Sequence, residues 1–166
     1  MNRKSTAFPL LLAGLGLAGP ALAETRVAVS MTAFDNPFLT IIREAIAAEA
    51  KKDGDVELVF EDAQLDVARQ LDQVQNFIAD GYDAIIVNAV DGASTTAITQ
   101  AAVAAGVPLV YVNHPPGDVD SLPEDVSFVG SNEVDSGTMQ TQQVCAMLGG
   151  KGNVLVIMGP LENHSA

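Results

Sequence analysis

Short apolar runs alternate with helical patterns along most of this chain. The runs are rich in Val, Ile and Leu and are bounded by turn residues, which is typical of strands buried on both faces of a parallel sheet. We predict strands at Val27–Met31, Val56–Phe60, Ala84–Val87, Leu109–Val112 and Val154–Met158, with one more short strand at Ser127–Gly130.

Amphipathic helices are predicted between these strands, because apolar residues recur there every three or four positions. The three stripes are Phe38, Ile41, Ile42, Ala45 and Ile46; Val67, Leu71, Val74 and Ile78; and Ala97, Ile98, Ala101, Ala102 and Ala105. Strands that alternate with helices predict right-handed crossovers. The fold class is therefore α/β, an open parallel sheet flanked by helices.

The regular pattern changes near Asn113–Asp125, where three prolines predict a long loop. A further helix is predicted at Asp135–Leu148, and Cys145 on it is expected to be buried and inert. The sequence stops shortly after the predicted strand Val154–Met158, without the helix that a crossover needs. We therefore expect it to be the first part of a longer protein.

The first 23 residues predict an export signal. Arg3 and Lys4 make its start positive, Phe8–Leu17 is apolar, and Ala21–Ala23 is a small-residue cleavage site. The apolar run is shorter than the roughly 18 residues that a membrane helix needs. We expect cleavage after Ala23 and an exported protein that does not insert into the membrane.

The formal net charge is −13, and it becomes about −15 once the two basic residues of the signal are removed. Such an acidic chain argues against nucleic acid as a partner, because phosphates are bound by Lys and Arg. Cys145 is the only cysteine, so no disulfide can form within the chain.

Polar and aromatic residues follow the predicted strands, and the carboxyl ends of parallel strands meet at one edge of a sheet. The candidates are Thr32, Phe34, Asp35, Asn36, Phe38, Asp62, Gln64, Asn88, Asp91, Asn113 and His114. Amides and carboxylates bond hydroxyl groups, and an aromatic face covers C–H surface. With Lys and Arg absent from the set, it suits a neutral polyhydroxylated ligand.

Several of these residues also have a purely structural interpretation. Asn36 fits an N-cap, and Phe38 heads an apolar stripe and could pack in the core. Asp91 fits a cap or a turn, Asn113 could only start a turn, and His114 could be an exposed loop residue.

Motifs for catalysis are lacking. The G-x-G-x-x-G match at Gly14–Gly19 lies inside the signal and follows no strand. Two histidines and one cysteine cannot complete a closed metal site unaided. We find no nucleophile–base pair, so we expect no enzyme activity, no cofactor and no metal.

Three ordered segments carry a family resemblance: Asp35–Phe38, Asp80–Asn88 and Ala105–Asn113. Together they resemble the periplasmic sugar-binding proteins of ABC importers, with the ribose-binding type closest in layout. Two later segments, Phe128–Asn132 and Gly149–Val154, are similar to the family's first hinge crossing and the opening of its second lobe.

The resemblance implies a monomeric periplasmic protein whose two α/β lobes close over a sugar and are then recognised by a membrane permease. Residues 1–23 would be the signal peptide, 24–130 the N-terminal lobe, and 131–166 the hinge crossing and the start of an incomplete second lobe. By position, Asn36 would bond sugar hydroxyls, Phe38 would stack on the ring, and Thr32 would occupy a small hydroxyl position.

Two departures from the ribose-binding pattern bear on the ligand. Leu39 replaces a second aromatic residue, and Asn113 with His114 stands where the ribose type carries Asp-Arg. Asn113 in its Val-Tyr-Val-Asn context is instead similar to the inositol- and rhizopine-binding branch. A cyclic polyol is the leading ligand, with pentoses and hexoses behind it.

The resemblance leaves two other roles open. A periplasmic sugar sensor for a chemoreceptor or kinase shares this fold, and a small exported α/β enzyme would need a nucleophile–base pair. Family members are about twice this length, and lobe closure supplies the second wall of the site. We therefore expect residues 24–166 alone to fold poorly or to bind weakly.

Overall fold

The computed structural model describes residues 24–157, so the predicted signal, Met158 and the residues after it lie outside the described part. Five parallel strands form one sheet in the order β2-β1-β3-β4-β5. They are β1 (Thr25–Met31), β2 (Val56–Asp62), β3 (Ala84–Val87), β4 (Leu109–Val112) and β5 (Val126–Val129). This arrangement confirms the predicted open parallel α/β sheet.

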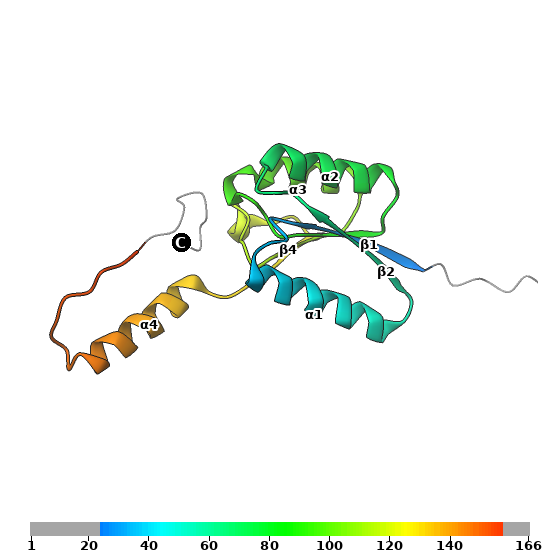
Figure 1. Ribbon diagram of the computed structural model, residues 1–166. Helices are drawn as coiled ribbons and strands as arrows, with labels where there is room; N and C mark the ends of the chain where they lie inside the picture. The colour runs from blue at the N-terminus through cyan, green and yellow to red at the C-terminus, as the bar shows by residue number, and fades with distance from the viewer. Residues whose placement is uncertain (1–23, 158–166) are drawn as a thin grey trace, which may run out of the picture.

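Helices cover the two faces of the sheet unequally (Figure 1). The α-helices are α1 (Pro37–Asp53), α2 (Val67–Ala79), α3 (Thr95–Ala105) and α4 (Glu133–Met147), and two short 3-10 turns occupy Gly92–Ser94 and Val119–Ser121. Helices α2 and α3 lie on one face of the sheet and α1 on the other. Strand β1 therefore has both of its faces covered, as its apolar sequence predicts, whereas β5 is only partly covered.

Alternate residues of each strand enter two separate cores. Ala28 of β1 joins a large core with Val74, Phe77 and Ile98 from α2 and α3. The adjacent Val29 faces the other way and joins a smaller core under α1. The α1 side is thus packed mainly around β1 and β2.

The predicted helical stripes were partly wrong. In α1, Leu39 is 3% exposed whereas Ile41 is 63% exposed. In α2, Val67 lies at the surface, while two glutamines, Gln70 and Gln73, are buried beside Val74 and Phe77. Leu71, Val74 and Ile78 do pack in or against the core, so the stripe was right for them. It missed the glutamines because the prediction counted apolar side chains only, and amides with hydrogen-bond partners can be buried equally well.

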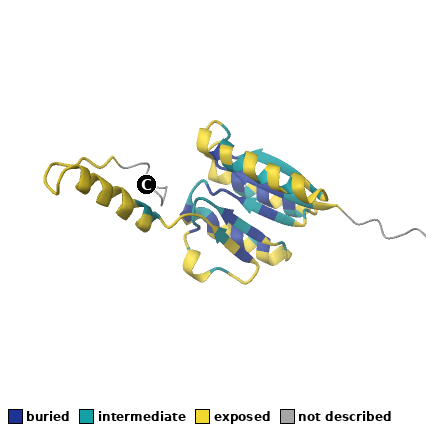
Figure 2. Ribbon diagram, turned by 90° about the horizontal axis from the view of Figure 1, so that it is seen from below, coloured by how far each residue is buried: buried dark blue, intermediate teal, exposed yellow. Residues whose placement is uncertain are grey.

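The end of the described chain differs from the prediction. Residues 154–157 form no strand and are exposed, because no described strand pairs with their backbone. Helix α4 has no buried residue and lies away from the α/β layers (Figures 1 and 2). Cys145 is consequently exposed, and the prediction that it is buried was wrong, since no described element covers that side of α4.

Candidate functional site

The loop between β1 and α1 carries the first two candidate residues. Asn36 is the N-cap of α1, and its Oδ1 accepts hydrogen bonds from the backbone N–H of Phe38 at 2.9 Å and of Leu39 at 3.4 Å. Its amide nitrogen has no acceptor among residues 24–157, and the residue is exposed. Asn36 can therefore cap the helix and still donate two hydrogen bonds outward.

Phe38 is not a core residue. Its side chain is 56% exposed, and Leu39 takes the buried position next to it. Phe38 lines an open hollow of about 360 Å³ whose wall also contains Asn113. The rest of the lining comes from α1 and from the ends of β4 and β5: Ile42, Ala45, Ile46, Val112, Val129, Gly130 and Ser131. The hollow is therefore largely apolar, with an aromatic ring and an amide in its wall.

Asn113 owes its position to an unusual backbone conformation. Its φ is +64°, in the left-handed region that few residues other than glycine and asparagine occupy. Its backbone N–H donates to the Val129 carbonyl at 2.9 Å, which fixes the residue to the end of β5. The turn interpretation is thus correct for the backbone, while the side chain lines the hollow.

The neighbouring His114 is tied to the loop after β3. Its Nδ1 lies 2.7 Å from the carbonyl oxygen of Ala89. A carbonyl can only accept, so Nδ1 carries the hydrogen and Nε2 of the neutral ring keeps a lone pair. His114 is half-buried rather than a freely exposed loop residue.

Thr32 is buried and connects two loops. Its hydroxyl lies 2.8 Å from the carbonyl oxygen of Asn88 and 2.9 Å from that of Ala89, to which it donates. The hydroxyl hydrogen is therefore already used inside the protein. Thr32 holds the β1 end against the β3 end.

Phe34 lies apart from the hollow that Phe38 lines. It contributes to a second hollow of about 340 Å³, together with Ala33, Asp35, Asp62, Gln64 and Leu65. The guanidinium of Arg43 covers its ring, with Cζ 4.0 Å from the ring centroid. Arg43 lines neither this hollow nor that of Phe38, so the cation supports the loop and does not line the candidate site.

Asp91 behaves as a cap. Its carboxylate accepts from the Ala93 N–H at 3.0 Å at the start of the 3-10 turn. It lines neither the hollow of Phe38 nor that of Phe34. The structure therefore brings Phe38 and Asn113 together, with Asn36 two residues before Phe38, and leaves Asp91 outside.

A buried tyrosine lies close to these loops. Tyr111 of β4 is fully buried, and its hydroxyl donates to the Thr95 carbonyl at 3.1 Å and contacts the Thr99 hydroxyl at 2.9 Å. Burial raises the pKa of Tyr111 to about 12, because ionisation would place a charge in the core.

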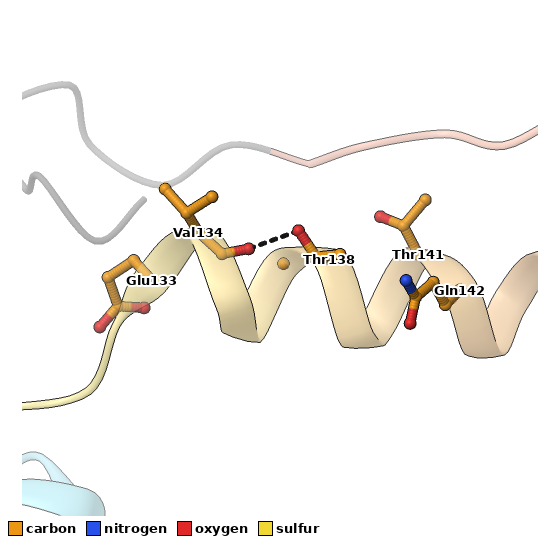
Figure 3. A pocket seen from close by; sticks show the side chains of 6 residues that line it. Glu133, Val134, Thr138, Thr141 and Gln142 are labelled. Carbon is orange, nitrogen blue, oxygen red and sulfur yellow. Dashed lines mark hydrogen bonds between the residues drawn. The ribbon is translucent and has the colours of Figure 1, made fainter.

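A further hollow, of about 430 Å³, lies along α4 alone (Figure 3). Its lining residues are Glu133, Val134, Gly137, Thr138, Thr141 and Gln142. The Thr138 hydroxyl donates back to the Val134 carbonyl at 2.7 Å and so serves the helix itself. This hollow is not at the carboxyl edge of the sheet, and we do not include it in the candidate site.

Sequence reasoning missed three residues that contact the loops or the strand ends near the site: Arg43, Gln70 and Gln73. Arg43 lies nine residues after Phe34 on a helix, so its contact with that ring depends on the tertiary fold. Gln70 and Gln73 were not included in the predicted stripe of α2, although their spacing with Val74 and Phe77 is that of a helix face. That spacing was the signal that could have found them.

Comparison with known proteins agrees with this fold. The family model described as "Periplasmic binding protein domain" matches residues 27–166. The "Putative rhizopine-binding protein" of Rhizobium meliloti is 48% identical over 157 residues, which are 92% of this chain and 51% of that protein. The "Xylitol-binding protein" of Mycolicibacterium smegmatis is 32% identical over 154 residues, covering 89% of this chain and 43% of that protein.

A solved structure shows the same arrangement. The ABC transporter solute-binding protein of Bacillus halodurans C-125 with bound myo-inositol superposes with a TM-score of 0.79 at 35% identity. The match covers 86% of this chain and 48% of that one. The chain thus spans about half the length of the relatives it matches. None of its helices within residues 24–157 has the length and hydropathy to cross a membrane. The chain belongs to the periplasmic binding protein family.

Proposed function

We propose that this chain supplies the N-terminal lobe of the substrate-binding component of an ABC importer for a neutral carbohydrate. The observation that carries the proposal is the shared hollow of Phe38 and Asn113 at the carboxyl edge of the sheet. In parallel α/β sheets this edge is where ligands bind.

The chemistry of the hollow favours a cyclic polyol. The exposed ring of Phe38 can cover the C–H face of a six-membered ring. The amides of Asn36 and Asn113 can donate to and accept from hydroxyl groups around that ring. A solved relative with bound myo-inositol, a cyclic polyol, supports this ligand class. The relative named for xylitol supports a polyol more generally.

The domain organisation is part of the same proposal. Residues 1–23 act as a signal peptide cleaved after Ala23, residues 24–130 form the first lobe, and residues 131–166 cross a hinge and begin the second. Two observations support the division: α4 does not pack on the α/β layers, and the relatives are about twice as long. The second lobe would supply the other wall of the site.

Transport is favoured over sensing because the solved relative at 35% identity is named as an ABC transporter protein. The protein binds without catalysing a reaction and acts as a monomer that delivers its ligand to a membrane permease. The net charge of −13 argues against nucleic acid as a partner.

The experiment is an NMR titration of the ¹⁵N-labelled chain, which detects weak binding and assigns it to residues. Millimolar myo-inositol should shift the backbone amides of Asn36, Phe38 and Asn113, and xylitol and ribose should shift them less. Charged amino acids serve as the negative control. Shifts confined to α4, or shifts produced only by the charged amino acids, would rule out the polyol site.

A further inference from the structure

Gln70 and Gln73 of α2 lie under the carboxyl edge of the sheet. Gln70 is 1% exposed and Gln73 is 7% exposed. Buried side-chain amides are costly unless every polar atom has a partner. Their partners are the last polar groups of the strands, at the places where the sheet's own hydrogen bonding ends.

Gln73 joins β1 to β2. Its Oε1 accepts from the Ser30 hydroxyl at 2.7 Å, and its Nε2 donates to the Asp62 carbonyl at 2.9 Å. Ser30 is fully buried and faces α2. Gln73 thus holds the final residue of β2 against β1.

Gln70 joins β1 to β3 and to the loop that follows β3. Its Nε2 donates to the Ser30 hydroxyl at 3.1 Å and to the Asn88 carbonyl at 3.0 Å. Its Oε1 accepts from the Val90 N–H at 2.8 Å. Both amide hydrogens and the carbonyl of Gln70 are therefore used.

Asn88 extends the connection to β4. Its Nδ2 donates to the Val112 carbonyl at 3.1 Å, and its Oδ1 accepts from the Thr32 N–H at 3.4 Å. Asn88 is fully buried, so its amide is unavailable to a ligand. One continuous network consequently links the ends of β2, β1, β3 and β4.

We propose that Gln70 and Gln73 are positioning residues, which set the spacing of the ligand-binding loops through Ser30 and Asn88. Two network atoms lead directly to candidate residues: the Val112 carbonyl belongs to the peptide that leads into Asn113, and Thr32 begins the loop to Asn36. The two glutamines of α2 thereby fix the ends of β1, β2 and β3, and Asn88 adds the end of β4. The inference rests on the proposed function for its ligand.

The test compares Gln70→Met and Gln73→Met, which keep side-chain length but remove the hydrogen bonds, with Gln75→Met on the exposed face of α2. In Gln70→Met, hydrogen exchange at the Val90 amide should rise about fivefold, the equivalent of one net hydrogen bond. Affinity for myo-inositol should fall about tenfold at a temperature well below the melting point, and the preference for myo-inositol over ribose should narrow. Gln75→Met should leave the Val90 exchange rate, the affinity for myo-inositol and the preference over ribose unchanged.

A lower melting temperature with unchanged myo-inositol affinity and preference would overturn the positioning role. If Gln70→Met does not fold, Ser30→Ala replaces it, because it removes only the hydroxyl that joins the two glutamines. If the wild-type chain binds no polyol, the proposed function fails. In that case hydrogen exchange alone tests the network. If the Val90 and Thr32 amides are as well protected in Gln70→Met as in the wild type, the network does not position the loops.

Discussion

The guanidinium of Arg43 stacks on the ring of Phe34, with Cζ 4.0 Å from the ring centroid. Arg43 is in the second turn of α1, and Phe34 is in the loop that precedes that helix. The Nη1 atom of Arg43 is buried and has no hydrogen-bond partner among the described residues, so the ring is the main compensation for its burial. The contact holds the β1–α1 loop against its own helix.

Replacing Arg43 should therefore loosen this loop. Arg43→Met is expected to lower the free energy of unfolding by about 0.5–1 kcal/mol, the usual contribution of a cation–π contact that is not fully buried. Urea unfolding measures the change. Arg69→Met, on the exposed surface of α2, is the matched control and should have little effect. Equal losses in the two variants would show that the contact with Phe34 contributes nothing specific.

Most of the fold could be predicted from the sequence because most of the parallel strands contain a short, largely apolar run between turn residues. Asn36 and Phe38 could be found for a related reason, since a residue that follows such a strand lies at the edge where ligands bind. Asn113 was found in the same way, and its side chain does line the hollow.

The remaining features depend on tertiary partners that local pattern does not show. Gln70 and Gln73 are buried only because strand ends supply their hydrogen bonds. Val154–Ile157 has a strand-like composition, yet without a pairing strand it stays irregular. Cys145 follows the same rule, because a helix buries a face only where another element covers it.

The buried Tyr111 should make the protein less stable at alkaline pH. Its pKa is raised to about 12 in the folded state, against about 10 in the unfolded chain. The folded state therefore holds its proton over that interval, so stability is full below pH 10 and is lost as the pH rises towards 12. The loss should be about 1 kcal/mol at pH 11.

Tyr111→Phe is the control for this titration. At neutral pH it should cost about 1 kcal/mol, because the bond to the Thr95 carbonyl disappears. Urea unfolding from pH 8 to 11 should then show a shallower decline in the variant than in the wild type. Parallel declines would mean that Tyr111 does not titrate late in the folded protein.

The two roles of Asn36 can be separated by substitution. Asn36→Ala should lower the free energy of unfolding by about 1 kcal/mol, because the N-cap of α1 is lost. Asn36→Ser keeps a capping oxygen and should remain within a few tenths of a kcal/mol of the wild type. Neither alanine nor serine carries the side-chain amide that would donate to a ligand, so the backbone amide shifts caused by myo-inositol should shrink in both variants. Full shifts in Asn36→Ser would assign Asn36 to capping alone.

Two substitutions of Asn113 can separate backbone strain from ligand contact, because its φ of +64° suits glycine but strains alanine. Asn113→Gly removes the side chain without strain and should leave stability unchanged or slightly raised. Asn113→Ala forces a Cβ-bearing residue without a helpful amide into the left-handed region and should cost about 1 kcal/mol. The backbone hydrogen bond to Val129 is available in both variants.

If Asn113 binds the ligand, the amide shift that myo-inositol causes at Phe38 should weaken equally in the two variants, although their melting temperatures differ. A glycine variant with undiminished shifts would remove Asn113 from the site and leave Phe38 and Asn36 to account for any binding.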